Sequence, residues 1–360
     1  MFVAWRDLRF AKGRFALMGA VITLITLLVG LLSGLTAGLG RQNISAITGL
    51  PADRIAFEAP GRGQRLSYAD STVTAAQWQR WSEVPKVTRA EPLGITTTRA
   101  TAGDRSTGVS AFGVRPGSHL APDAGRIRGN AAVLSATAAA DLGLAPGGTF
   151  TLAGRTMSVA AVRGDASFSH TPVIWTSLTA WQRVAPPNGA GPTATVIALD
   201  TTGGADVTAA DRAIGTRTVT RDDSLSAIGS YTSENGSLQL MRGFLFAISA
   251  LVVGAFFTVW TIQRGGDIAV LKALGASTAH LIGDALGQAA VLLVAGTLLG
   301  TGTAAALGAL VVRGAVPFLL TPATVLVPAA VMILLGALGA ALSVRRITSV
   351  DPLTALGSAR

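Results

Sequence analysis

The chain contains no cysteine, and among its 360 residues only three are histidine and three are lysine. Without cysteine it has no disulfide framework, no thiolate nucleophile, no cysteine-ligated metal and no thiolate-held haem. The histidines, His119, His170 and His280, are too scattered to suggest a zinc site, and no lysine follows a glycine as a phosphate-binding P-loop requires. The run 108–113 (GVSAFG) misses the G-x-S-x-G elbow of serine hydrolases by one residue. The sequence therefore predicts no catalytic residue, no intrinsic cofactor and no metal site of its own.

Charge is also scarce. Charged residues make up 13% of the chain and hydrophobic residues 49%, which is too apolar for an ordinary soluble enzyme of this length and is typical of a membrane protein. The formal charge of +10 does not come from a basic tract with interleaved aromatic residues, and part of the excess lies beside apolar segments. We therefore expect membrane lipids, and no nucleic acid, as a partner.

Four gaps between successive charges reach the length of about 20 residues that a membrane-crossing helix needs. They predict transmembrane helices over 15–38, 242–263, 282–312 and 323–344. Pro317 and Pro322 predict a short turn between the last two helices. The first helix is too long and too leucine-rich for a signal peptide, so we expect an uncleaved anchor.

Basic residues near the helix ends predict the orientation of the chain. They precede the first helix, lie between the second and third, and follow the fourth, which makes these faces and both termini cytoplasmic in a multi-pass protein of the cell membrane. Residues 40–240 hold 18 of the 29 basic and 15 of the 19 acidic residues. This nearly balanced composition predicts a folded extracytoplasmic domain with its stalk over 39–241.

That insert alternates short β-type runs with helical stretches, so we expect an α+β domain inserted between transmembrane helices 1 and 2. The predicted strands are 109–114, 131–134, 149–152, 157–162 and 194–199, and the predicted helices are 74–83, 135–142 and 204–214. Residues 222–241 contain no proline, and Tyr231, Glu234, Leu238 and Met241 recur at helical spacing. This spacing predicts a stalk helix that continues into the second transmembrane helix.

The segment 264–281 carries the sharpest signal. Ile268, Leu271 and Leu274 form a short apolar face flanked by Asp267 and Lys272, and Gly275 is placed to end the helix. Such a helix could fill a groove in a partner protein. Periodicity alone equally allows a helical loop that lies on the membrane surface.

Motifs in this segment and at both ends of the chain resemble one family. Residues 264–277 (RGGDIAVLKALGAS) resemble the cytoplasmic coupling segment of the MacB/FtsX class of ABC transporter permeases, R-x-x-E-I-A-x-L-(K/R)-A-(L/I)-G-A-(S/T), with Asp267 in place of the usual Glu. Residues 345–356 (RRITSVDPLTAL), in the tail 345–360, resemble the family's closing motif, in which Asp351 caps and Pro352 opens an interfacial helix. The start, within 1–14, is similar to the family's amphipathic N-terminal helix.

The resemblance implies a homodimer of permeases working with two copies of a separate ATPase, which binds the ATP and magnesium. It also implies mechanotransmission, in which closure of the ATPases moves stalks and extracytoplasmic domains without a central channel. Asp267, Ile268, Leu271, Lys272 and Leu274 would then dock on the ATPase. The large insert and the absence of a fused ATPase make the chain most similar to the HrtB haem-exporter group, or the related DevC group, which makes haem the first choice of substrate.

A haem exporter needs an apolar cleft with a weak axial ligand for the iron. Tyr231, Glu234 and Met241 share one face of the predicted stalk helix, and Arg41 lies at the outer end of the first transmembrane helix, where it could pair with a propionate. The alternative is that the first three pack a stalk at a dimer seam and that Arg41 is a membrane anchor. His170 fits a loop histidine better than a ligand, and Phe244 and Phe246 fit lipid-facing positions.

Three other functions stay open. One is an FtsX-like regulator whose extracytoplasmic domain acts on a cell-wall hydrolase. Another is a lipoprotein-releasing permease of the LolC/E type, and the third is a membrane-bound enzyme. Stimulation of ATP hydrolysis by a small molecule would favour an exporter, whereas binding of a protein to the extracytoplasmic domain would favour a regulator.

Overall fold

The computed structural model describes residues 12–185, 191–263, 266, 270–272, 274–311 and 316–344. The chain divides into two compact units. One comprises the chain up to Gly38 together with the chain from Ser237 onward, and the other is the insert Leu39–Gly236. Most of the predicted N-terminal helix 1–14 and all of the predicted tail 345–360 lie outside the described residues.

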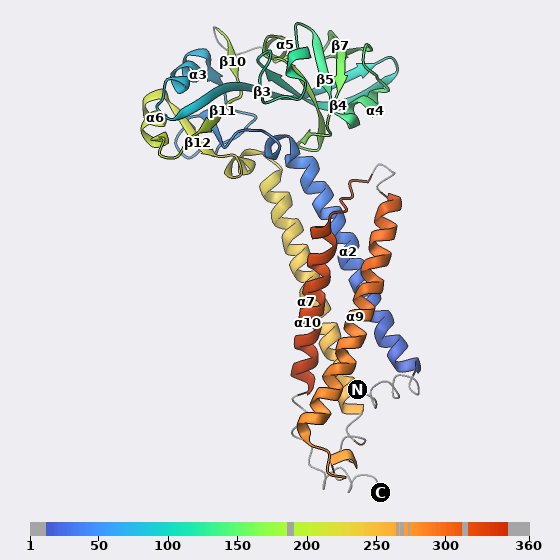
Figure 1. The fold of residues 1–360 in the computed structure, drawn as a ribbon. Coiled ribbons are helices and arrows are strands. Elements are labelled where there is room, and N and C mark those ends of the chain that lie inside the picture. The colour runs from blue at the N-terminus through green and yellow to red at the C-terminus, as the bar shows by residue number, and fades with distance from the viewer. Residues whose placement is uncertain are drawn as a thin grey trace. The chain divides into compact units, whose positions relative to one another are not determined.

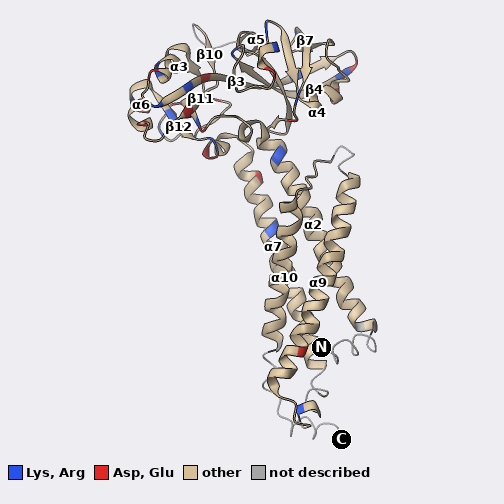
Figure 2. Cartoon of the chain, in the orientation of Figure 1, with Lys and Arg blue, Asp and Glu red and all other residues tan. Residues whose placement is uncertain are grey.

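The first unit is built from four long helices, α2 (Lys12–Thr48), α7 (Tyr231–Gln263), α9 (Thr278–Val311) and α10 (Pro322–Val344); the end of α2 and the start of α7 extend into the insert unit. Each is long and apolar enough to cross a membrane. Their bodies carry almost no charge, as Figure 2 shows: α7 has Glu234 in its first turn and Arg242 about three turns further on, and α9 has Asp284 in its second turn. The fold class predicted from the sequence, four transmembrane helices with an α+β insert after the first, is confirmed.

Capping residues decide where two of these helices begin. Thr321 and Thr324 exchange hydrogen bonds between backbone N–H and hydroxyl groups (2.9 and 3.2 Å) at the start of α10, which begins on Pro322, one residue before the predicted start at 323. The hydroxyl of Ser277 accepts from the backbone N–H of His280 (3.3 Å), and α9 begins at the next residue, Thr278. The last four residues of the predicted segment 264–281 therefore belong to α9.

Small residues let the helices of this unit approach closely. Gly254 of α7 and Gly339 of α10 lie backbone to backbone, and beside them the hydroxyls of Thr258 and Ser343 are 2.9 Å apart. Less than two turns further along α7, Trp260 packs edge-on against Phe15 of α2 and Phe257 of α7. These contacts belong to a buried cluster contributed by all four helices.

The insert unit contains twelve strands and four short helices among the described residues. The strands are β1 (Arg54–Glu58), β2 (Val73–Thr74), β3 (Val87–Ala102), β4 (Arg105–Val114), β5 (Ala131–Leu134), β6 (Thr149–Leu152), β7 (Arg155–Val162), β8 (Ser167–Phe168), β9 (Thr171–Ser177), β10 (Thr193–Ala194), β11 (Val196–Thr201) and β12 (Thr216–Thr220). The helices are α3 (Ala75–Ser82), α4 (Ala136–Leu142), α5 (Leu178–Val184) and α6 (Val207–Ile214), with 3-10 turns η1 (Ala124–Arg126) and η2 (Asp223–Ala227).

Ten strands form one mixed sheet in the order β12-β1-β11-β3-β4-β9-β5-β7-β6, with β8 paired to β9 (Figure 1). The long strand β3 also pairs with β6, which closes the strands from β3 to β6 into a ring. Two neighbouring pairs, β4 with β9 and β5 with β7, are parallel, and the other pairs are antiparallel. The remaining strands, β2 and β10, pair with each other.

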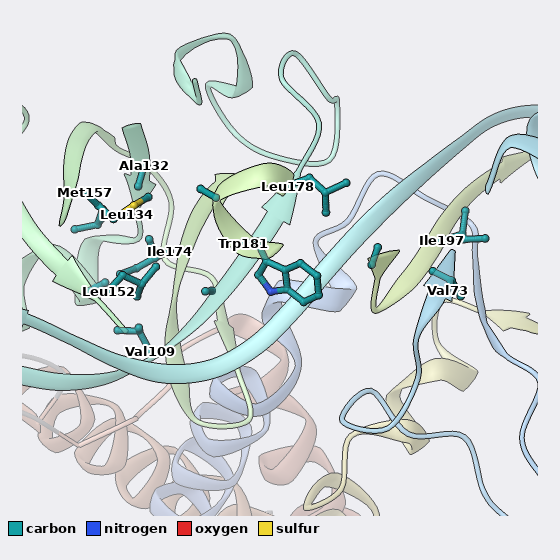
Figure 3. Packing of buried hydrophobic residues seen from close by; sticks show 14 of the residues in the cluster. Val73, Val109, Ala132, Leu134, Leu152, Met157, Ile174, Leu178, Trp181 and Ile197 are labelled. Carbon is teal, nitrogen blue, oxygen red and sulfur yellow. The ribbon is translucent and has the colours of Figure 1, made fainter. Parts of the chain in front are cut away.

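The period-two alternation of the strands divides the core into two layers. Along β1, Ala56 points into the layer that α3 to α6 cover, whereas Ile55 and Phe57 point into the opposite layer, which also holds the end of α2. In the helix-covered layer, Trp181 of α5, labelled in Figure 3, packs over Gly94 and Gly113. These two glycines are directly paired on β3 and β4, and a β-carbon at either position would overlap the Trp181 side chain.

The helix predicted over 222–241 begins later in the structure. Residues 223–227 form the 3-10 turn η2, and α7 starts only at Tyr231. Leu225, Ala227 and Ile228 are buried in the sheet layer that holds the end of α2, which an α-helix starting at 222 would not allow for all three. From Tyr231 onward the predicted continuation into the second apolar helix is confirmed.

Candidate functional site

Glu234 lies in the first turn of α7, where a carboxylate is favoured by the partial positive charge of the helix N-terminus. The imidazole Nε2–H of His170 donates to its Oε2 atom at 2.7 Å, because an ionised carboxylate only accepts hydrogen bonds. The Nδ2 group of Asn43 donates to the same oxygen at 3.0 Å and to the hydroxyl of Ser230 at 3.2 Å. We call Asn43, His170, Ser230 and Glu234 the carboxylate junction.

The junction joins three segments that are distant in sequence. Asn43 lies near the end of α2, His170 lies in the turn between β8 and β9, and Glu234 lies on α7. Backbone bonds reinforce it: the N–H groups of Ser169 and His170 donate to the carbonyls of Asn43 (2.9 Å) and Gln42 (3.2 Å). The turn is thus bound to the last turns of α2 by its main chain as well as by its side chain.

This turn has an unusual backbone. Ser169 and His170 have φ angles of +48° and +63°, the left-handed region that two-residue hairpin loops normally fill with Asn-Gly. Each non-glycine residue held there costs about 1 kcal/mol or more, and such strain persists only where surrounding contacts impose it. Here the contacts with α2 impose it, and strained residues of this kind cluster at functional sites.

Of the four residues predicted to bind haem, the structure brings Tyr231 and Glu234 into one neighbourhood. The ring of Tyr231 is half-buried and packs against the sheet layer that includes Ile44 of α2. Arg41 is exposed on α2, and Met241 is exposed on α7 within the other unit. Sequence reasoning missed Asn43 altogether and set His170 aside as a loop residue, because nothing in spacing or composition links either of them to Glu234.

The predicted coupling segment is described in part. Residues 270–272 are helical, and Gly275 ends the segment with φ at +93°. The N–H of Ala276 donates to the Leu271 carbonyl and that of Gly275 to the Lys272 carbonyl, both at 3.0 Å, which is the Schellman pattern that a glycine in this position predicts. Leu271 and Leu274 are 41% and 79% exposed. Asp267 and Ile268 lie outside the described residues.

Within the described ranges, no group of three or more His, Asp or Glu side chains is placed to hold a metal ion. The junction offers one imidazole, one carboxylate and one amide around a solvent-accessible position, with His170 and Glu234 32% and 42% exposed. Chemically, this arrangement can orient a carboxylate towards a cation or a hydrogen-bond donor.

Two family models match the chain. One, described as the MacB-like periplasmic core domain, matches residues 16–217, and the other, described as the FtsX-like permease C-terminal, matches residues 240–352. The first covers nearly all of α2 and the insert unit up to residue 217, and the second covers α7 from residue 240 onward, α9, α10 and the residues up to 352.

Individual proteins match along the whole chain. The permease HrtB of Staphylococcus haemolyticus, which its name assigns provisionally to hemin transport, is 26% identical over 364 residues and covers 99% of each chain. An uncharacterized ABC transporter permease of Mycobacterium tuberculosis, Rv2563, is 24% identical over 360 residues with the same coverage. Among solved structures, the periplasmic region of MacB from Actinobacillus actinomycetemcomitans matches with a TM-score of 0.35 and 13% identity, over 50% of this chain and 94% of that one.

Proposed function

Because this chain belongs to the MacB/FtsX family of ABC transporter permeases, we propose that it is the membrane subunit of an exporter for haem or a similar amphiphile. The observation that carries the proposal is the match to HrtB, which extends over 99% of both chains and so includes the helices, the insert and the last segment together. A separate ATPase supplies the energy, since the motifs for nucleotide binding are missing from this sequence.

In this proposal the substrate site includes Tyr231, Glu234, Met241 and Arg41. Glu234 and Tyr231 supply oxygen ligands, which suit ferric haem iron, and Met241 supplies a thioether. Arg41, exposed and positively charged, would pair with a propionate.

The ATPase would bind the segment around Leu271. Its exposed leucines and the helix end at Gly275 support a docking role, because a short helix with one apolar face fits a groove in a partner. Asp267, Ile268 and Lys272 would complete this surface. The permease would act as a homodimer with two ATPases. ATP-driven movement would pass along α7, because this one continuous helix, Tyr231–Gln263, includes Glu234 and ends shortly before the docking segment.

ATP hydrolysis by the permease co-purified with its cognate ATPase, in lipid nanodiscs, tests the proposal. We expect haemin to stimulate hydrolysis more than unrelated amphiphiles do, and Tyr231→Ala and Glu234→Ala to abolish that stimulation. Ser233→Ala is the matched control, because Ser233 is exposed in the same turn of α7 and, among the described residues, its hydroxyl donates to the Ser230 carbonyl alone. Equal stimulation by every amphiphile, or by none, would contradict haem as the substrate. Tight binding of a cell-wall protein to the insert would instead favour a regulator.

A further inference from the structure

Both hydrogen bonds that Glu234 receives from other segments end on one of its two oxygens. His170 and Asn43 donate to Oε2, and among the described residues no donor is found for Oε1. The side chain of Glu234 is 42% exposed, so Oε1 is accessible from outside. The carboxylate is therefore fixed at one oxygen and open at the other.

Asn43 adds a second unused acceptor. Its side chain is only 2% exposed, and its Oδ1 atom is buried without a hydrogen-bond partner, although Nδ2 makes two bonds. An unpaired buried carbonyl is destabilising, and folded proteins retain few of them. The orientation of the Asn43 amide explains why Oδ1 is unpaired: both hydrogens of Nδ2 are used, one for Glu234 and one for Ser230.

The carboxylate junction also resembles the surroundings of carboxylates that bind metal centres. Carboxylates that bind metal centres are themselves held by hydrogen bonds from neighbouring side chains, which fix the plane of the carboxylate and are needed for full affinity. His170 is presented on a strained turn that is bound by its backbone to α2, and Asn43 is buried on α2 itself. Both donors are therefore fixed by the fold. They hold the Glu234 carboxylate more rigidly than hydrogen bonds from water would.

We infer that Asn43 and His170 are positioning residues, which hold Glu234 so that Oε1 faces a cationic centre of the substrate. The inference rests on the proposed function, in which that centre is the iron of haem. It adds two residues to the site that belong to neither α7 nor the predicted ligand set. It also means that occupancy of Oε1 is transmitted directly to α2 and to the β8–β9 turn, because both are bonded to the other oxygen of the same carboxylate.

Equilibrium titrations of the full chain in nanodiscs, followed by the haem absorbance spectrum, test the inference. We expect His170→Ala to weaken haemin binding about tenfold, and His170→Gln to recover part of the loss because its amide can still donate. Asn43→Ala should weaken binding to a similar extent. Ser169→Gly is the matched control, since it changes the same turn, relieves its strain and leaves both donors to Glu234 in place.

Protoporphyrin IX, which lacks iron, separates positioning of an iron ligand from general packing. Its affinity, followed by fluorescence, should be unchanged in all four variants, and thermal unfolding of each variant should show that it is folded. Wild-type binding of haemin with unchanged affinity in folded His170→Ala and Asn43→Ala would overturn this inference alone. An equal loss for haemin and protoporphyrin IX would also overturn it. Absence of haemin binding by the wild type would overturn the proposed function, and this inference with it.

Discussion

The carbonyl of Pro317 lies against Gly38 of α2, in the space that a β-carbon at position 38 would occupy. Close by, the N–H of Leu319 donates to the carbonyl of Gly34 at 3.0 Å, and the ring of Phe318 fills a slot formed by Gly34 and Gly308. The segment between α9 and α10 is thus docked on the backbone of α2. The two prolines predict only a turn there, and the docking depends on glycines in two other helices.

Replacing Gly38 with alanine should destabilise the helical unit. The new methyl group would overlap a backbone carbonyl that cannot move freely, and overpacking of this kind costs about 1–3 kcal/mol, more than the gain in helix propensity of up to about 1 kcal/mol. Thermal unfolding in detergent measures the effect. Gly302→Ala is the control, because nothing lies within 4 Å of a β-carbon at that position of α9, and it should be neutral or stabilising. Equal melting temperatures for the two variants would contradict the packing described here.

Replacing Leu271 with aspartate should uncouple the ATPase from transport. A charge in the apolar face of the proposed docking helix would have to be desolvated against the partner, whereas Leu271 is 41% exposed in the free chain and its replacement should not unfold it. We expect loss of substrate-stimulated ATP hydrolysis and weaker co-purification of the ATPase. Leu271→Met, of similar volume, should retain both. Normal coupling in the aspartate variant would rule out this face as the docking surface.

Replacing His119 with glutamine should destabilise the loop around His119, which is bonded to β3, β11 and the segment that follows α2. Nδ1 of His119 lies 2.9 Å from Oε1 of Glu91 on β3, and Nε2 lies 3.1 Å from Oδ2 of Asp200 on β11 and 3.0 Å from the carbonyl of Pro51. Glutamine cannot reach all of these acceptors at once, and a lost bond to a charged group costs about 1.5–3 kcal/mol, less at this partly exposed position. Amides of residues 117–121 should exchange hydrogen faster, by about tenfold, in mass spectrometry. His280→Gln, at an exposed position on α9, should leave that exchange unchanged.

Stability should fall at alkaline pH because of Tyr68. Burial raises the pKa of its phenol far above the usual value near 10, and its hydrogen bond to the Ser224 hydroxyl (2.9 Å) lowers the pKa by less. The unfolded chain therefore loses this proton at lower pH than the folded chain. The contribution to stability is fully present below about pH 10 and declines above it, by up to about 1.4 kcal/mol per pH unit.

Unfolding of the full chain by denaturant between pH 8 and pH 11 measures this decline. Tyr68→Phe should remove the slope contributed by Tyr68 and cost about 1 kcal/mol at neutral pH through the lost hydrogen bond. Tyr231→Phe, which replaces the other of the two tyrosines, is the matched control and should keep that slope. An identical decline in all three proteins would show that Tyr68 does not cause it.

The helices of the insert were predictable where local signals agree. The ranges 74–83, 135–142 and 204–214 contain α3, α4 and α6, because serine, threonine or aspartate caps precede short apolar stretches, as Ser135 does for α4. The long strand β3 and the helix α5 were not predicted. Most of β3 reads as a polar segment, and its stability comes from pairing with β4, β11 and β6, which no local pattern encodes.

The sequence by itself determined the four apolar helices and their order, because the thickness of a membrane sets a minimum length of uncharged chain that few other constraints would produce. It also determined the turn at Gly275, where one residue type satisfies a local backbone requirement. Only the tertiary structure decided the partners of Glu234. Asn43 and His170 stand 191 and 64 residues away from it, and hydrogen bonds over such separations depend on how the sheet brings the β8–β9 turn against α2, not on spacing along the chain.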